Sequence, residues 1–533
     1  MTLPLPTVDI AGMDTLLDIS RRHALERPDS VALSFEGRET TYARFHRNSN
    51  QVANALIAQG LLPGHRVAYL GKNCDRYFEA VFGAAKAGIV MTPIGWRLAP
   101  AEAVFMLEDC DARVIFVGPD GSSQANAALD QLARRPLVIA IDDAAVKAAT
   151  PFNLWRETAP SEDPVTKVLP HDVVLQMYTS GTTGRPKGAM LTHASMLGKQ
   201  RDAAKVQMAW HRWTTDDVSL VAMPVGHVGG TLWGIVGLLY GAKGVIVREF
   251  DPLSVLDYIE RDRISKMFMV PAALQIVVRQ PRSRQVNFAR LKYILYGASP
   301  IPLELLRECM EVFGCGFCQQ YGMTETTGAI VYLPPEDHDP SGNARMRAAG
   351  LPMPGVELKV IDDDGAPLPP HAVGEVLTRS SGNMAGYWRM PEATAATLDP
   401  EGWLRTGDAG YLDEDGYLFI HDRVKDMIIS GAENIYPAEV ENAIYGHPSV
   451  ADVAVIGVPD EKWGEAVKAV VVLKPGAPQD ADDIVAFARA RIAAFKVPKS
   501  VDFIDALPRN ATGKVLRREL RDPYWAGRTR KVN

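Results

Sequence analysis

Short apolar runs alternate with amphipathic helical segments along most of the chain. Thr41 can cap a helix that Gly60 would end. Within that segment Phe45, Val52 and Leu56 share one face, as an amphipathic helix requires. Alternation of strands and helices predicts largely parallel β-sheets that are covered by helices. The other expected strands lie at 66–70, 89–93, 113–117, 266–270, 291–296 and 317–321, and the other helices at 75–86, 253–261 and 303–313.

The pattern changes after about residue 420. Two apolar strands are expected at 453–458 and 469–473, and a helix at 481–495. A chain of 533 residues is also too long for one compact core. We therefore expect an α/β protein with a large N-terminal domain of mostly parallel sheets, residues 1–422, and a small mobile α+β C-terminal domain, residues 423–533.

Two other stretches need an interpretation. The segment 118–170, rich in alanine, aspartate and proline, is expected to be a surface excursion between two sheets. The most apolar stretch, 228–247, is interrupted by glycines and by Lys243, which favours packing inside a globular domain over a membrane span. The first residues carry no basic and apolar signal sequence, so no targeting segment is expected.

The composition is mildly acidic. Lys and Arg number 57 against 64 Asp and Glu, a net charge of −7, so nucleic acid is not an expected partner. The five cysteines are few and odd in number, which favours a reducing, cytoplasmic location over a disulfide framework. Cys315 and Cys318 form a C-x-x-C, but no second pair of ligands is evident nearby. We interpret them as buried thiols.

A run of small polar residues follows the apolar segment 173–177. From Tyr178 to Gly188 it reads Tyr-Thr-Ser-Gly-Thr-Thr-Gly-Arg-Pro-Lys-Gly. Backbone N–H groups and hydroxyls in such a run can surround phosphate oxygens, and Lys187 adds a positive charge. The P-loop of kinases requires Ser or Thr after its lysine, so Gly188 excludes that pattern. A phosphate-binding loop is expected here, with a flexible polar loop as the alternative.

Three further segments carry candidate chemistry. Residues 320–326 read Gln-Tyr-Gly-Met-Thr-Glu-Thr and bring an aromatic ring, hydroxyls and a carboxylate to a strand end. Residues 403–408 read Trp-Leu-Arg-Thr-Gly-Asp, and the aspartate suits ribose hydroxyls. Residues 508–514 end in Lys514. Each segment alone has a structural alternative, since an exposed lysine in a turn is usually just solvated.

In order and spacing these segments resemble the adenylate-forming superfamily of acyl-CoA synthetases, 4-coumarate–CoA ligases, luciferases and peptide-synthetase adenylation domains. The resemblance runs from about Val31 to Lys514. Residues 423–441 read Arg-Val-Lys-Asp-Met-Ile-Ile-Ser-Gly-Ala-Glu-Asn-Ile-Tyr-Pro-Ala-Glu-Val-Glu, which is similar to the acyl-CoA synthetase branch. The resemblance implies ATP, Mg²⁺ and coenzyme A as cofactors and co-substrates, a small-molecule carboxylic acid as substrate, and a possible homodimer.

The same resemblance implies roles at the nucleotide. Tyr321 would stack on adenine, while Asp408 and Arg423 would bind the ribose. The phosphate-binding loop would contain Thr179, Ser180, Gly181, Thr182, Thr183, Gly184 and Lys187. The adenine pocket would also contain Gly297, Ala298, Ser299, Gln320, Gly322 and Met323.

Further roles concern catalysis. Thr324 would contact the α-phosphate, Glu325 would hold Mg²⁺, and Lys514 would be the catalytic lysine. His227 would lie beside the acid and the path of coenzyme A, and Lys425 would be the hinge. Gly431 and Asn434 would belong to a loop near the pantetheine. Ala432 in that loop replaces a glycine that members commonly have, a change that would tune thioester formation if the position needs a positive φ.

The acyl pocket is expected from residues 227–234, 295–299 and 322–330. Apart from Glu325 and His227, these segments contain no charged side chain, so charged substrate tails should be rejected. The glycines of the first segment either leave volume for substrate or serve close backbone packing. We expect a hydrophobic monocarboxylate, with medium- to long-chain fatty acids ahead of cinnamate-type or steroid side-chain acids. The expected substrate residues are His227, Val228, Gly229, Gly230, Trp233, Tyr296 and Gly322.

The expected activity is an ATP-dependent acid–CoA ligase that forms acyl-AMP and pyrophosphate, then acyl-CoA and AMP. Two alternatives stay open. One is an adenylating enzyme that does not use coenzyme A, and the other is a catalytically silent nucleotide-sensing scaffold. Lys187, Glu325, Asp408 and Lys514 argue against the scaffold.

Overall fold

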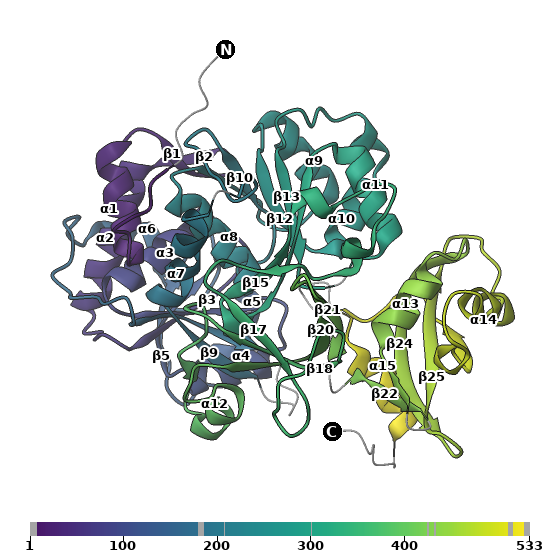
Figure 1. Ribbon diagram of the computed structural model, residues 1–533. Coiled ribbons are helices and arrows are strands. Elements are labelled where there is room, and N and C mark those ends of the chain that lie inside the picture. The colour runs from purple at the N-terminus through teal and green to yellow at the C-terminus, as the bar shows by residue number, and fades with distance from the viewer. Residues whose placement is uncertain are drawn as a thin grey trace.

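The computed structural model describes residues 8–179, 186–206, 208–299, 301–423, 426–430, 433–509 and 515–526. Residues up to 423 form three β-sheets with their helices, and residues from 426 onward form a fourth sheet (Figure 1). The first sheet has eight strands, of which those from β8 to β7 in spatial order run parallel. Its spatial order is β19 (Gly386–Tyr387), β9 (Lys187–Thr192), β8 (Val173–Thr179), β4 (Val90–Ile94), β3 (Arg66–Leu70), β5 (Ala112–Val117), β6 (Leu137–Ala140) and β7 (Thr150–Pro151).

The second sheet has nine strands. Its central strands, from β14 to β1 in spatial order, are parallel, and antiparallel strands close both edges. The spatial order is β16 (Leu351–Pro352), β15 (Gly328–Leu333), β14 (Gly316–Met323), β13 (Tyr293–Gly297), β12 (Lys266–Met269), β10 (Val218–Val221), β11 (Lys243–Ile246), β1 (Val31–Phe35) and β2 (Arg38–Thr41).

Helices cover both sheets, and α3 is buried along its whole length because it contacts strands of both sheets. The carboxylate of Glu79 on α3 is fully buried and accepts hydrogen bonds from Arg76, Arg156 and Asn48 at 2.7, 2.6 and 2.8 Å. A buried charge with this many partners is tolerated. The helices of this part are α1 (Leu16–Glu26), α2 (Tyr42–Ala58), α3 (Asp75–Lys86), α4 (Pro100–Asp109), α5 (Ser122–Leu129), α6 (Phe152–Glu157), α7 (His193–Ala204), α8 (Val228–Leu239), α9 (Pro252–Arg261), α10 (Pro271–Val278), α11 (Leu303–Phe313) and α12 (Pro391–Thr397).

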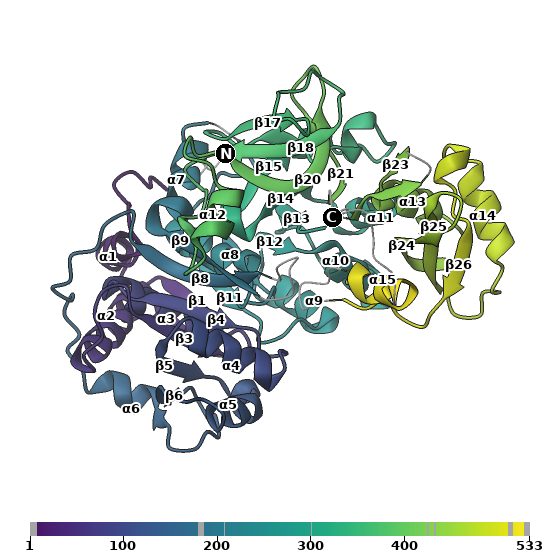
Figure 2. The ribbon, with the colours of Figure 1, turned by 90° about the horizontal axis from the view of Figure 1, so that it is seen from below.

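The third sheet is antiparallel and was not predicted from the sequence. It consists of β17 (Glu357–Ile361), β18 (Gly374–Arg379), β20 (Leu404–Leu412) and β21 (Leu418–Arg423). Figure 2 shows it above the nine-stranded sheet, on the side from which the chain continues to the fourth sheet.

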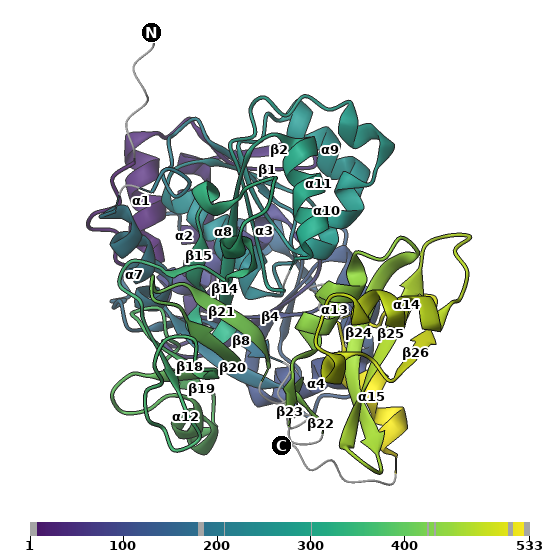
Figure 3. The ribbon, with the colours of Figure 1, turned by 45° about the vertical axis from the view of Figure 1, so that its right-hand side comes forward.

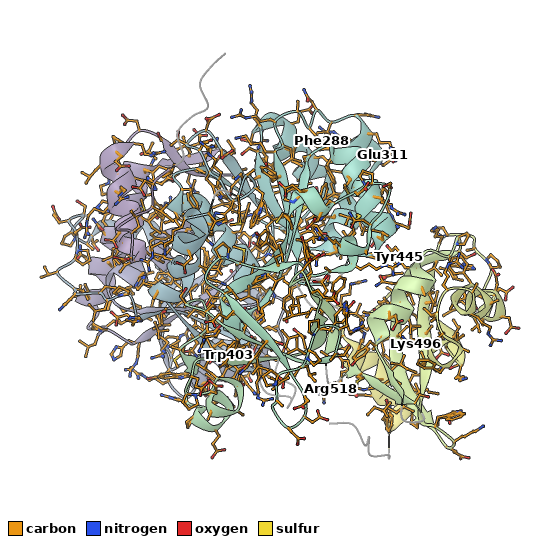
Figure 4. All side chains as sticks on the ribbon, viewed as in Figure 1. Phe288, Glu311, Trp403, Tyr445, Lys496 and Arg518 are labelled. Atoms are coloured by element: carbon orange, nitrogen blue, oxygen red, sulfur yellow. The ribbon has the colours of Figure 1, made fainter. Side chains whose placement is uncertain are left out.

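The fourth sheet carries the α+β pattern expected after residue 420. Turned to the side in Figure 3, it stands beside the rest of the molecule with α13 toward α10 and α11. The hydroxyl of Tyr445 on α13, labelled in Figure 4, is hydrogen-bonded to the side-chain amide of Gln275 on α10. The elements are β22 (Ile428–Ser430), β23 (Glu433–Ile435), α13 (Pro437–Tyr445), β24 (Val450–Asp460), β25 (Gly464–Leu473), α14 (Ala481–Arg489), β26 (Ser500–Phe503) and α15 (Arg517–Trp525).

Most expected elements are present, and two expectations were wrong. The segment 118–170 is neither a surface excursion alone nor a link between two sheets. Leu137–Ala140 is the parallel strand β6, and β5 and β8 on either side of the segment belong to the same eight-stranded sheet. The helix expected at 481–495 ends at Arg489, after which Ile492 turns back to pack on the small core of the fourth sheet.

The cysteine interpretation agrees with the structure. Cys318 is buried and Cys315 half-buried, and burial raises the pKa of Cys315 to about 12. Within the described ranges, no group of three or more His, Cys, Asp or Glu side chains is arranged to hold a metal. No helix in the described part of the chain is long and apolar enough to cross a bilayer, and the apolar stretch 228–247 forms α8 and β11.

Two glycines of α8 allow close packing against neighbouring segments instead of leaving space for a substrate. A Cβ on Gly234 would lie 2.3 Å from the ring of Phe78 on α3, and one on Gly230 would lie 2.3 Å from the carbonyl oxygen of Pro224. Both distances are far below van der Waals contact. The packing alternative therefore holds for these two glycines, which let α8 approach its neighbours.

We predict that Gly234→Ala lowers the free energy of unfolding by about 1–3 kcal/mol, because the added methyl overpacks the contact with Phe78. The matched control is Gly237→Ala on the same helix, where the nearest atom to a new Cβ is the Ser219 hydroxyl at 3.2 Å. That variant should be neutral or more stable, since alanine favours a helix. Thermal unfolding measures both variants, and equal shifts in Tm would contradict the packing argument.

Candidate active site

The run of small polar residues connects two neighbouring antiparallel strands. β8 ends at Thr179 and β9 begins at Lys187, and these two residues are paired across the hairpin. The ammonium of Lys187 lies 5.0 Å from the centre of the Tyr387 ring on β19. The strand-end position expected for this loop is confirmed. Its members Ser180, Gly181, Thr182, Thr183 and Gly184 lie outside the described residues.

The carboxylate of Glu325 lies beside this hairpin. Glu325 follows β14 in a short 3-10 turn, Thr324–Thr326, and is only 5% exposed. Its Oε1 accepts hydrogen bonds from Thr179 Oγ1 at 3.1 Å and from Tyr387 Oη at 2.9 Å. The hydrogen bonds of this buried carboxylate therefore join the nine-stranded sheet to the eight-stranded sheet.

The surroundings of Glu325 fit a magnesium ion. Mg²⁺ is usually bound by one or two carboxylates together with substrate phosphates rather than by an all-protein cage. A single carboxylate next to a phosphate-binding hairpin offers that arrangement, and Oε2 of Glu325 accepts no hydrogen bond from another described residue. Glu325 is accordingly the residue that would hold the metal.

The expected nucleoside residues lie on neighbouring strands. Tyr321 Oη on β14 donates a 2.5 Å hydrogen bond to Oδ2 of Asp408 on β20, and Asp408 is 6% exposed. Arg423 on β21 is the backbone partner of Asp408, so the two residues expected at the ribose are directly opposite each other. The side chain of Arg423 lies outside the described residues.

The Gly297–Ser299 turn closes the other side of β14. Gly297 is paired with Gln320, and a Cβ on Gly297 would lie 2.0 Å from the carbonyl oxygen of Gln320. Ala298 has a φ of 68°, a left-handed conformation that costs a non-glycine residue free energy. Strain at this position is typical of a binding turn, and Ala298 lines the cavity that also contains Glu325.

One cavity of about 2070 Å³ joins the phosphate hairpin, Glu325 and Ala298 to an apolar region beside α8. Tyr321, Asp408 and Gly297 do not line it. His227 caps the start of α8, and burial lowers its pKa to about 4, so the imidazole is neutral at pH 7. The cavity brings together most residues expected for the acid and for catalysis. They are Thr179, Lys187, His227, Val228, Gly229, Gly230, Trp233, Gln320, Gly322, Met323, Thr324 and Glu325.

Tyr296 is the expected substrate residue that the structure contradicts. Its ring is fully buried on the other side of β13, where its hydroxyl is hydrogen-bonded to His338 Nε2 at 3.0 Å. Successive residues of a strand face opposite sides, so Leu295 lines the cavity instead. Gly234 is also absent from the lining, because it packs against Phe78.

Several lining residues were missed in the sequence. Lys199 on α7 is 4% exposed, and its ammonium donates to the carbonyls of Thr326, Thr327 and Ala329 at 2.7, 2.9 and 2.8 Å. It thus fixes the turn that follows Glu325. Nothing in the helical pattern distinguishes Lys199 from a solvated lysine. The aromatic run 210–213 was the one available signal. The lining residues that were missed in the sequence include Lys199, Gln200, Trp210, His211 and Tyr387.

The C-terminal part contributes to the mouth of the cavity. Arg509 and Val515 form an isolated antiparallel bridge, and both line the cavity, as do residues of α15 such as Arg518 (Figure 4). Asn434 lies in β23. Lys514, Lys425 and Gly431, with Ala432, lie outside the described residues.

Comparison with known proteins decides the family. Residues 20–388 match the AMP-binding enzyme family, and residues 439–514 match the AMP-binding enzyme C-terminal domain. The chain belongs to the AMP-binding enzyme family. The match confirms the expected adenylate-forming superfamily, and the relatives confirm its acyl-CoA synthetase branch. This AMP-binding enzyme is thus an AMP-forming acid–thiol ligase.

Three relatives show how far the similarity extends. The AMP-binding enzyme is 42% identical to a fatty acid–[acyl-carrier-protein] ligase of Streptomyces coeruleorubidus, with 98% of each chain covered. It is 39% identical to a feruloyl-CoA synthase of an Amycolatopsis species, with 94% of this chain and 97% of the relative covered. The structure of the anthranilate CoA ligase AuaEII in complex with anthranoyl-AMP superposes with a TM-score of 0.89 at 28% identity, covering 98% of each chain. The expected α/β fold is confirmed.

We predict that Tyr387→Phe lowers the rate of adenylate formation about tenfold and raises the Mg²⁺ concentration needed for half-maximal rate. The variant keeps the ring beneath Lys187 but removes one donor to the Glu325 carboxylate, and hydrogen bonds to charged groups contribute about 1.5–3 kcal/mol. Pyrophosphate release against Mg²⁺ concentration measures the effect. Tyr258→Phe on α9, away from the cavity, is the control, and an unchanged Mg²⁺ dependence in Tyr387→Phe would refute the role.

Proposed function

We propose that this AMP-binding enzyme is an ATP-dependent acid–CoA ligase that acts on a hydrophobic monocarboxylic acid. It would first form acyl-AMP and pyrophosphate, and then acyl-CoA and AMP. The observation that carries the proposal is the continuous cavity, which joins the phosphate hairpin and Glu325 to an apolar region beneath α8. ATP and an apolar acid can therefore meet at Thr324 and Glu325.

The first step joins two anions, so charge neutralisation and positioning dominate its catalysis. One carboxylate oxygen of the acid attacks the α-phosphorus of ATP, and the bond to the β,γ-pyrophosphate breaks. Lys187 would face the phosphates, and Lys514 would stabilise the charge that develops on the α-phosphoryl oxygens. A Mg²⁺ ion held at Glu325 would neutralise phosphate charge. Asp408, held by Tyr321, would fix the ribose and thus the direction of attack.

His227 lines the cavity at the start of α8. Its pKa of about 4 makes it a neutral hydrogen-bonding group across the physiological range. A neutral imidazole next to the reacting carboxylate leaves the nucleophilic oxygen without an ion-pair partner, which favours attack on phosphorus. His227 is therefore proposed to orient the acid.

The second step needs a different surface over the same intermediate. The thiolate of coenzyme A attacks the acyl carbon, and AMP leaves. We propose that residues 423–533 move as a domain about Lys425, with Lys514 facing the site in the first step and the loop of Gly431 and Asn434 facing it in the second. The division at residues 422 and 423 falls at the end of β21, where the third sheet ends.

Coenzyme A is the proposed acceptor because residues 423–441 are similar to the acyl-CoA synthetase branch. A carrier-protein thiol is the second candidate, since the 42% identical relative is an acyl-carrier-protein ligase. A cytoplasmic location is part of the proposal, because the five cysteines are all free thiols and coenzyme A chemistry needs a reduced thiol.

The proposed acid is a medium- to long-chain fatty acid, ahead of cinnamate-type or steroid side-chain acids. Val228, Leu232, Trp233 and Phe268 form apolar walls of the cavity. Among the relatives, one ligase acts on a fatty acid and another forms feruloyl-CoA. Enzymes of similar sequence therefore act on both kinds of acid.

We predict that Lys514→Ala reduces acyl-adenylate formation by about a hundredfold or more, the usual effect of losing one preorganised charge contact. The variant should still convert supplied acyl-adenylate and coenzyme A into thioester at a substantial rate.

Wild-type enzyme should release AMP and pyrophosphate in equal amounts, and ADP as the main product would refute the function. Lys425→Pro should show the opposite pattern: it should keep acyl-adenylate formation and lose thioester formation, because a fixed φ blocks hinge rotation.

We predict that kcat/KM decreases in the order dodecanoate, octanoate, ferulate and α-amino acid, because a charged ammonium has no partner in the apolar walls. The assay follows pyrophosphate release with each acid, with coenzyme A and with a holo acyl carrier protein as acceptors. Preference for the amino acid would contradict the pocket argument. Preference for ferulate would change only the ranking of the acids. Thioester formation on the carrier protein alone would show that the carrier protein, and not coenzyme A, is the acceptor.

A further inference from the structure

The turn that follows Glu325 has an unusual backbone. Thr327 has a φ of 50° and Gly328 a φ of 82°, so both residues adopt left-handed conformations. A positive φ is costly for a β-branched residue, and strain of this kind persists only where surrounding groups hold it in place. The carbonyls of Thr326, Thr327 and Ala329 all accept hydrogen bonds from one group, the ammonium of Lys199, at 2.7, 2.9 and 2.8 Å. Lys199 therefore binds the backbone on both sides of Gly328.

The buried position of Lys199 is costly for the fold. The residue is 4% exposed, and burial lowers the pKa of its ammonium to about 7. Within the described ranges it forms no ion pair, and the three backbone carbonyls take all three of its N–H groups. A buried cation without a counter-charge destabilises a protein. A methyl-ended side chain of the same length would fill this space at lower cost, so the lysine is explained by the backbone that its ammonium holds.

Lys199 also packs against the segment that leads to Tyr387. A Cβ on Gly382 would lie 2.4 Å from Cε of Lys199, so the backbone of this segment approaches the lysine closely. The same segment donates to Glu325 twice. The N–H of Met384 donates to the Glu325 carbonyl at 2.8 Å, and Tyr387 Oη donates to its carboxylate at 2.9 Å. Lys199 thus contacts both backbone segments that hold Glu325.

The helix α7 gives Lys199 a fixed position. Thr192 caps this helix, since its hydroxyl accepts a hydrogen bond from the N–H of Ser195 at 3.0 Å. His193 in the first turn is buried, and its Nδ1 accepts a hydrogen bond from the N–H of Leu16 at 3.1 Å. Groups on helices hold a site more precisely than groups on loops do. The ammonium is therefore a fixed support for the turn and not a mobile side chain.

We propose that Lys199 is a positioning residue for acyl-adenylate formation, which directs the Glu325 carboxylate by holding the strained turn behind it. The inference rests on the proposed ligase function, in which Glu325 would hold Mg²⁺. Because the three carbonyls occupy its ammonium, Lys199 acts through the turn and not on the reacting atoms. A functional group must be held within about 0.5 Å of its productive position. Loosening the turn should therefore weaken the hold on the metal-bound nucleotide.

The test begins with Lys199→Met, which removes the ammonium and keeps the length of the side chain. Deuterium exchange of the backbone amides of residues 324–330, measured without Mg²⁺ or ATP, should become about tenfold faster, because the turn opens more often once its support is lost. The Mg²⁺ concentration for half-maximal pyrophosphate release should rise about tenfold, the size expected from losing hydrogen bonds to a charged group. Saturating Mg²⁺ should restore most of the rate, which a loss of folded enzyme would not allow.

A second variant reaches the same support from the other side. Gly382→Ala keeps the lysine but displaces it, because the new Cβ would lie 2.4 Å from its Cε. The variant should show the same two changes as Lys199→Met at a smaller size, and it tests the inference even if Lys199→Met does not fold.

The matched control is Lys266, another buried lysine on which a backbone segment depends. Its ammonium donates to the carbonyls of Trp210 and Arg212 at 3.1 and 2.6 Å, and burial lowers its pKa to about 7 as well. Lys266→Met should lower Tm, as Lys199→Met does. It should leave both the exchange of residues 324–330 and the Mg²⁺ dependence unchanged, because the segment that it holds does not carry Glu325.

Each outcome bears on the inference. Faster exchange with an unchanged Mg²⁺ dependence overturns it, because Lys199 would then serve the fold alone while the ligase function stands. An equal rise in the Mg²⁺ requirement of Lys266→Met also overturns it, since any loss of stability would then give the effect. If wild-type enzyme released pyrophosphate with none of the acids, the ligase function itself would be refuted and this inference with it.

Discussion

One buried carboxylate, that of Glu325, sets the arrangement of the site. The side chain follows the last parallel strand of the nine-stranded sheet, and its hydrogen-bond donors, Thr179 and Tyr387, belong to the eight-stranded sheet. An anion in this position is tolerated only with fixed donors or a cation. The hydrogen bonds of Glu325 therefore join the two sheets at the point where ATP and the acid are proposed to meet.

The sequence predicted those features that local signals determine. The bounds of β3 and α3 agree with expectation residue for residue, and Thr41 caps α2 as its position indicated. The strand-end position of the phosphate loop was predicted from the apolar run before it, whereas Asp408 and Arg423 were placed together only by the resemblance to the family. Periodicity and turn chemistry act over a few residues, so they can be read without the fold.

Features that depend on contacts between distant residues were missed. Tyr296 was expected in the cavity, but the strand directs Leu295 there, and a shift of one residue reverses a side chain. Gly230 and Gly234 were read partly as empty volume, whereas Pro224 and Phe78 fill the space next to them. The Tyr387 contact with Glu325 joins residues 62 positions apart, for which one sequence carries no signal.

The connection between β8, β9 and α7 brings one helix to both the turn after Glu325 and the cavity. The hairpin that is proposed to hold the phosphates leads directly into α7, which supplies Lys199 to the turn after Glu325 and Gln200 to the lining of the cavity. Adjacent residues of one helix thus face the turn after Glu325 and the cavity. If ATP and the acid meet at this turn as proposed, substitutions on α7 should affect the binding of both.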